Sequence, residues 1–254
     1  MDPGIAALAG RMADLLAAMD GDRDPARFFL GTYLRTTEAV DAALDTGRFE
    51  DARWVSALVV DFADRYLHAL RGFRAGNADV PRPWQLAFGA DSGLPPEAHV
   101  LLGMNAHINY DLPLALLAMV PPAAFADPFV LDRRRRDHER IDAVLASRIG
   151  AEDLALEAAG GRRTLLDRVI APANRQAART FLREARRKVW SNASALEAAR
   201  QRGPDDVARR VADLEQAAAD RVRDLLRPGP VLLRLAVRGF GVTIVPTPIP
   251  GSPA

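Results

Sequence analysis

The sequence predicts an all-α protein: a single-domain multi-helix bundle with a central apolar helix and a long C-terminal helical pair. Helix-capping residues followed by proline recur along the chain, as in Asp24-Pro25 and Asp127-Pro128, and proline is favoured at the first position of a helix. Between these signals, apolar residues recur at helical spacing. Only the tail, from Val231 to Val245, has the β-branched residues and glycines of a strand.

Length and composition limit the class of protein. The 254 residues are 49% hydrophobic, which is enough for one large domain. We expect residues 1–254 to form one helical domain, with its core in 25–200 and an apolar tail of undetermined structure in 229–254. The chain has no cysteine, which excludes disulfides, thiolate metal sites and cysteine nucleophiles.

The charge balance and the termini bear on partners and location. A net charge of +1 gives no field that would attract nucleic acid. The N-terminus lacks the basic region of a secretory signal, and the apolar run from Val231 to Val245 is short for a membrane span and contains two arginines. We therefore expect a cytoplasmic protein that binds no nucleic acid and spans no membrane, with its oligomeric state open.

Two amphipathic helices are predicted in the first third of the chain. The first begins at Asp24-Pro25 and carries Phe29 and Tyr33 at helical spacing. The second begins at Asp51 and ends near Gly72. Its apolar residues recur at i, i+3, i+4 and i+7, and they are Trp54, Val55, Leu58, Val59, Phe62, Tyr66, Leu67 and Leu70.

Residues 76–96 are rich in glycine and proline and predict a long irregular connection. Such connections in compact domains tend to be functional, so we expect this one to form a lid or wall of a site, with Trp84 contacting the ligand. Pro95-Pro96 then opens the central apolar helix, from about Glu97 to Met119.

The second half of the chain is predicted to be helical as well. Asp127-Pro128 begins a helix that runs through Ile149. Further helices are predicted at about 163–170, from Pro172 to about Ala199 and from Pro204 to about Leu226. The last two form an outer pair rather than a second domain, because their apolar face is narrow. The segment from Val231 to Val245 is left unassigned, since a lone strand has no partner.

One block of the central helix carries most of the side chains that could do chemistry. Between Gly103 and Pro113 lie Asn105, His107, Asn109, Tyr110 and Asp111. On the 51–72 helix, Asp64 and His68 have the same four-residue spacing as His107 and Asp111. If the two helices pack face to face, the two pairs converge and offer imidazole and carboxylate ligands to one Zn²⁺, Mn²⁺ or Fe ion.

Pro113 predicts a kink or break at Leu112, because proline has no N–H to donate to the carbonyl of Asn109. A purely structural interpretation of the block carries equal weight. In it, Asp111 caps a new helix at Pro113, and His107 and the asparagines form a hydrogen-bond network between helices.

The run Arg133 to Arg136, followed by Asp137 and His138, has the composition of a phosphate-binding patch. A charge run on a helix is more often a solvated face, and we favour that interpretation, leaving the role of His138 open. The sequence contains no glycine-rich nucleotide loop, nucleophile elbow or H-E-x-x-H motif.

Several segments carry a family resemblance. They are Phe28 to Tyr33, Phe49 to Asp51, Trp54 to Leu70, Pro83-Trp84, Gly103 to Pro113 and Ala185 to Trp190. Together they resemble an uncharacterised family, the domain of unknown function 5995, over roughly residues 25–200. This resemblance implies a helical protein and no particular reaction.

A more local likeness concerns chemistry. The segment from His107 to Leu114 is similar to the H-x-x-x-D motif, followed by proline, of helical zinc-dependent phospholipase C and P1-type nucleases. Those enzymes use further histidines to hold a three-zinc cluster. With four histidines in the whole chain, the likeness implies one metal or none.

Three functions follow from these features. The first is a metal-dependent, hydrolase-like enzyme for a small molecule, with His68, His107 and Asp111 as ligands and Asp64 as a ligand or general base. Its substrate contacts would be Asn105, Asn109, Tyr110 and Trp84. The second is a metal-free cyclase, lyase or binding protein for an apolar metabolite of a biosynthetic pathway, with His107 and Asp111 as an acid–base pair. The third is a structural or interaction protein whose 172–226 helices dock a partner.

Overall fold

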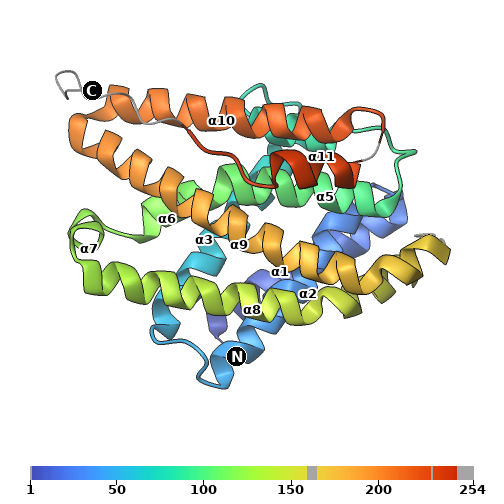
Figure 1. Cartoon of the computed structure of the whole chain (residues 1–254), viewed down its shortest axis with the longest axis horizontal. Helices are drawn as coiled ribbons and strands as arrows, with labels where there is room; N and C mark the ends of the chain where they lie inside the picture. The colour runs from blue at the N-terminus through green and yellow to red at the C-terminus, as the bar shows by residue number, and fades with distance from the viewer. Residues whose placement is uncertain (1, 159–164, 230, 245–254) are drawn as a thin grey trace.

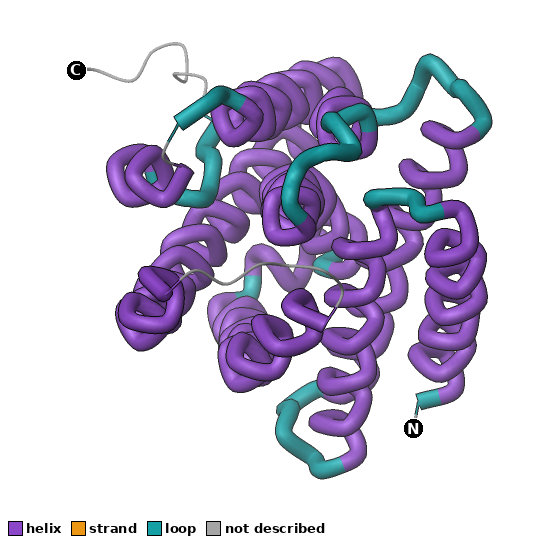
Figure 2. Tube along the Cα trace, turned by 90° about the vertical axis from the view of Figure 1, so that its right-hand side faces the viewer, coloured by secondary structure: helices purple, strands orange, loops and turns teal. Residues whose placement is uncertain are grey.

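The computed structural model describes residues 2–158, 165–229 and 231–244. These described residues form helices joined by loops, with no strand among them (Figure 2). The predicted all-α class is confirmed. None of the described helices is long and apolar enough to cross a lipid bilayer.

The first three helices pack against one another. They are α1 (Pro3–Asp22), α2 (Ala26–Asp45) and α3 (Ala52–Arg74). A carboxylate oxygen of Asp24 accepts the N–H of Ala26 at 2.8 Å, and one of Asp51 accepts the N–H of Trp54 at 3.0 Å. Both predicted helix starts are therefore confirmed. Helix α1 was not predicted from the sequence; its apolar face is buried through Ile5, Leu8, Met12 and Met19.

The connection between α3 and the central helix differs from the prediction, because it is not irregular throughout. It contains the short helix α4 (Arg82–Phe88). Pro83 lies in the first turn of α4, where proline is favoured. Trp84 is completely buried, so α4 is anchored to the core by its largest side chain.

The central helix is continuous from Pro96 to Met119, although the sequence predicted a kink or break at Leu112. It consists of α5 (Pro96–Ala106), the π-helical turn η1 (His107–Asp111) and α6 (Leu112–Met119). The N–H of Leu112 bonds to the carbonyl of His107, five residues earlier. This wider turn lets the backbone continue through Pro113, whose missing N–H would interrupt an ordinary helical turn. The side chain of Asp111 caps no helix, so that part of the structural interpretation is wrong.

The second half of the chain contains α7 (Pro122–Ala126), α8 (Pro128–Ala158), α9 (Leu165–Arg202), α10 (Pro204–Leu226) and α11 (Val231–Arg238). The two helices predicted at 163–170 and from Pro172 form the single helix α9; positions 163 and 164 lie outside the described residues. The predicted C-terminal pair is confirmed as α9 and α10, joined at Gly203. The tail left unassigned by the sequence is helical in α11 and non-helical from 239 to 244.

Helices from both halves of the chain pack against the central helix (Figure 1). α5 packs against α2, α4 and α10, whereas α6 packs against α3 and α9. In Figure 1, α9 crosses diagonally between α8 and α10. The central helix lies close to α2 at Gly103 of α5, where a Cβ would lie 2.5 Å from Cγ of Phe29 on α2. Only glycine fits at this position.

Replacing Gly103 with alanine is expected to lower the free energy of unfolding by about 1–3 kcal/mol, because the added methyl overlaps the Phe29 ring in a closed core. Gly10→Ala is the matched control: Gly10 is also helical, but it is exposed and a Cβ there meets no atom within 4 Å. The control is expected to raise the free energy of unfolding by up to about 1 kcal/mol through helix propensity. Urea denaturation measures both, and an equal effect of the two substitutions would contradict the close packing at Gly103.

Candidate functional site

A buried carboxylate ties the π-helical turn to α4. Oδ2 of Asp111 accepts the indole N–H of Trp84 at 2.9 Å and lies 2.8 Å from Nδ1 of His107. All three side chains are buried. Because Oδ2 accepts the indole N–H, we infer that it also accepts from His107, with the imidazole proton on Nδ1 and the lone pair on Nε2.

The imidazole of His107 lies inside a cage of aromatic rings. The Phe62 ring stacks on it with 3.5 Å between centroids and 3° between planes. Tyr33 meets it edge-on at 4.7 Å. The other rings of the cage are Phe29, Tyr66 and Trp84. Burial lowers the pKa of His107 below its usual value despite the opposing effect of Asp111, so the ring is neutral, and Nε2 has no hydrogen-bond partner among the described residues.

Asn105 and Asn109, expected to contact a substrate, instead bind the chain's own C-terminal segment. Their side-chain N–H groups donate to the carbonyl of Phe240 at 3.2 and 3.1 Å. Oδ1 of Asn109 also accepts the N–H of Val242 at 3.1 Å. Tyr110 packs in a small apolar cluster with Leu196, Leu214, Ala218, Val242 and Ile244. These three residues of the predicted site therefore serve the packing of the tail.

Asp64 and His68 do not converge with His107 and Asp111. Asp64 pairs with Arg11 at 2.8 Å on a half-exposed surface, and His68 is exposed. In the part of the chain that the structure describes, no three His, Asp or Glu side chains gather closely enough to hold a metal ion. The donor set expected for Zn²⁺, Mn²⁺ or Fe is thus not assembled, and the described residues do not fit such an ion.

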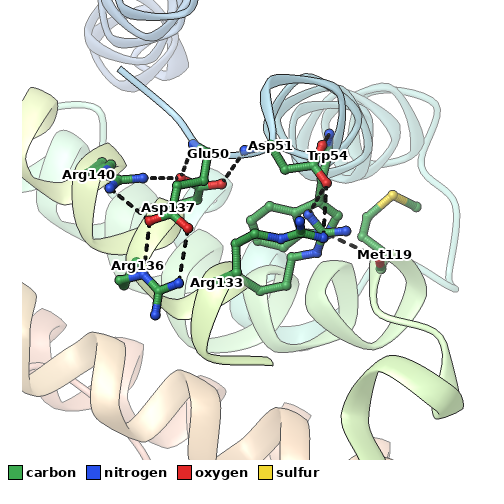
Figure 3. A network of polar contacts seen from close by, with 9 residues as sticks. Glu50, Asp51, Trp54, Met119, Arg133, Arg136, Asp137 and Arg140 are labelled. Carbon is green, nitrogen blue, oxygen red and sulfur yellow. Dashed lines mark hydrogen bonds and ion pairs between the residues drawn. The ribbon is translucent and has the colours of Figure 1, made fainter. Parts of the chain in front are cut away.

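The arginine run of α8 forms neither a phosphate patch nor a purely solvated face. Arg136 binds Glu50 through two hydrogen bonds, and Arg134 binds Asp51 at 2.6 Å. Asp137, which is fully buried, accepts the backbone N–H groups of Glu50 and Asp51, each at 2.8 Å (Figure 3). Hydrogen bonds from Arg136 lower the pKa of Glu50 to about 2. These contacts of Arg134, Arg136 and Asp137 hold the turn before α3 against α8.

Sequence reasoning missed an apolar cavity of about 80 Å³ on the other side of Phe62. Its apolar lining comes from four parts of the chain: Leu58, Val59, Phe62, Ile108, Leu112, Ile141, Leu145 and Ala185. Because these residues are spread from 58 to 185, no local spacing pattern could have revealed the cavity.

Three ionisable side chains also line the cavity: His138, Asp142 and Arg186. Arg186 donates to Asp142 at 2.8 Å. Burial raises the pKa of Asp142 to about 7, although Arg186 opposes the shift. Burial, with a smaller effect of Arg186, lowers the pKa of His138 to about 3. The cavity therefore contains a carboxyl group, that of Asp142, with a pKa near neutral pH. It also contains a histidine, His138, that is neutral at that pH.

The pKa of His138 makes the stability of the fold depend on pH. The unfolded chain binds a proton at this residue near pH 6.5, whereas the folded chain resists protonation down to about pH 3. Stability present above pH 6.5 is therefore lost as pH falls toward 3, by about 1.4 kcal/mol per pH unit from this group. His138→Phe cannot titrate, so the free energy of unfolding of the wild type minus that of this variant is expected to fall as pH falls below 6.5, as measured by urea unfolding at several pH values. Parallel profiles of the two proteins would contradict the burial of a neutral His138.

The comparisons with known proteins give one match. A family described as a family of unknown function, DUF5995, matches residues 5–228. The match includes the His107–Asp111 pair, Asn105, Asn109 and the cavity, and it ends before the segment that the asparagines bind. No curated protein and no solved structure matches the chain. The chain belongs to the DUF5995 family.

Proposed function

We propose that this protein binds and transforms a small, largely apolar molecule with one polar group, and that it does so without a metal ion. The molecule occupies the cavity between α3, the central helix, α8 and α9. One observation carries the proposal: a single ring, Phe62, lines this cavity and also stacks on the neutral imidazole of His107.

The lining of the cavity indicates the class of ligand. Its surface is mostly apolar, and burial of apolar ligand surface is favourable at about 25 cal/mol per Å². Asp142 and Arg186 provide the only charged lining among the described residues. They suit one hydroxyl, amine or carboxylate group on an otherwise apolar molecule, which is the usual composition of a small-ligand site.

The pair His107 and Asp111 supplies acid–base chemistry. Asp111 holds the imidazole through Nδ1 and leaves Nε2 with a free lone pair, the arrangement of a histidine base oriented by a carboxylate. Rotation of the partly exposed Phe62 side chain would join the cavity to His107. A ligand held by Asp142 and Arg186 that reaches the edge of the imidazole would then give a proton to Nε2 and keep the electron pair of the broken bond as its conjugate base.

Xenon is a suitable probe because it enters apolar cavities of this kind. We expect saturable binding of xenon to the protein, measured by ¹²⁹Xe NMR, and loss of this binding in Val59→Phe, which fills the cavity. Ala57→Phe adds the same ring at an exposed position of α3 and is expected to bind xenon as the wild type does. Circular dichroism checks that both variants are folded.

Further measurements distinguish this proposal from a metal-dependent enzyme and from a purely structural role of the polar core. Small polar–apolar compounds that displace xenon are assayed for conversion, which His107→Gln should abolish while xenon binding persists. Xenon binding that survives EDTA treatment agrees with a metal-free site, whereas conversion lost with EDTA would favour the metal-dependent enzyme. A folded wild-type protein that binds no xenon would refute the proposal. The buried polar side chains would then have a structural role only.

A further inference from the structure

A surface cleft of about 380 Å³ lies between α8 and α9, where the two helices pack against each other (Figure 1). Its α9 side is a single face of that helix, because Arg187, Trp190, Ser191 and Ser194 recur at spacings of three and four residues. Arg187 is exposed, and it has no ion-pair partner among the described residues. This face therefore presents a free cation, an indole ring and two hydroxyl groups to the cleft.

The α8 side of the cleft adds a second cation. Arg135 is the member of the arginine run that does not contact the turn before α3. Its guanidinium lies 5.6 Å from the centre of the Trp190 ring, and its ion pair with Asp132 is exposed and long, at 3.4 Å. Arg186 and Glu139 complete the charged lining, and the Glu139 side chain is 57% exposed. Three arginines against one glutamate make the cleft attractive to an anion.

A thin layer of side chains separates this cleft from the apolar cavity beside Phe62. Arg186 lines both spaces. His138 of the cavity and Trp190 of the cleft are neighbours, with 6.0 Å between their ring centroids. Arg186 donates to Asp142 through one of its five N–H groups, which leaves others for an anion in the cleft. A ligand that shifts the side chains of this layer would therefore reach from the cleft into the cavity.

Two polar atoms in this layer lack hydrogen bonds. Nε1 of Trp190 and Nδ1 of His138 have no partner among the described residues, and the two side chains are only 6% and 4% exposed. A buried polar atom without a partner costs free energy, so these atoms indicate a place for a polar group of a ligand. The indole N–H is a donor, and it suits an oxygen of an anion.

We propose that the cleft binds the anionic end of the ligand whose apolar part occupies the cavity, so that the ligand is an apolar molecule ending in a carboxylate or phosphate group. This inference rests on the proposed function and narrows its substrate class. Guanidinium groups bind both kinds of anion. The anion is held by Arg135, Arg186 and Arg187, and the apolar part enters the cavity past Trp190 and His138.

The test compares probes that share a six-carbon chain: hexanoate, hexyl phosphate and 1-hexanol. Each is titrated into xenon-loaded protein, and displacement of xenon, measured by ¹²⁹Xe NMR, reports occupation of the cavity. We expect at least one of the two anions to displace xenon at a concentration roughly tenfold lower than hexanol does. The stronger anion identifies the anionic group of the ligand. Added sodium chloride should reduce this advantage, because salt screens the exposed arginines.

Variants with effects of opposite sign connect this advantage to the cleft. Arg187→Gln should reduce the advantage of the anion over hexanol by roughly tenfold, whereas Glu139→Gln should increase it, because the negative charge of the lining is removed. Arg53→Gln is the matched control, since Arg53 is also exposed but lines neither space. All three variants should still bind xenon, because none of these residues lines the cavity. Val59→Phe, which fills the cavity, should reduce the affinity for hexanoate, measured by calorimetry, to that for acetate.

Xenon binding separates failure of this inference from failure of the proposed function. A protein that binds xenon but has equal affinity for hexanoate, hexyl phosphate and hexanol would overturn the inference and leave the proposed function intact. An anion advantage that Arg187→Gln leaves unchanged would overturn it too. So would anions that bind in the cleft without displacing xenon, because the cleft would then be a separate site. A protein that binds no xenon would overturn the proposed function and this inference with it.

Discussion

The carboxyl group of Asp111 is buried, and the centre of the structure is arranged to satisfy its hydrogen bonds. A buried polar group is tolerated only where hydrogen-bond partners meet it. Here the donors are the indole of Trp84 and the imidazole of His107, one from α4 and one from the same π-helical turn. The first contact fixes α4 against the central helix, and the second fixes the tautomer of His107. Removing either donor would leave the carboxylate partly unpaired in the core.

The same helix presents a second polar pair on a different side. Asn105 and Asn109 lie two positions before His107 and Asp111, which at helical spacing is roughly 200° around the axis. One pair consequently points into the aromatic cage, and the other binds the backbone carbonyl of Phe240. This division gives both asparagines and the His107–Asp111 pair hydrogen-bond partners within the most apolar helix of the chain, although Oδ1 of Asn105 and Nε2 of His107 have none among the described residues.

The sequence could predict contacts between residues that are close along the chain, but not contacts between residues that are far apart along it. The caps at Asp24 and Asp51 act on residues within one turn, and both helix starts were predicted correctly. The four-residue spacing of His107 and Asp111 likewise indicated their contact. The contact of Trp84 with Asp111 spans 27 positions and that of Asn109 with Phe240 spans 131, and neither leaves a local pattern. Pro113 signalled a disturbed helix, but the sequence did not show that the chain would continue through a π-helical turn instead of breaking.

The central claim is that Asp111 holds a neutral His107 with its proton on Nδ1 and a free lone pair on Nε2. Nitrogen-15 NMR of the His107 ring tests this directly, because the two nitrogens of a neutral imidazole have widely separated shifts and those of an imidazolium do not. At about pH 6, where a free histidine used as reference is largely protonated, we expect His107 to remain neutral with the proton on Nδ1. A charged ring at that pH, or a neutral ring protonated on Nε2, would contradict the account.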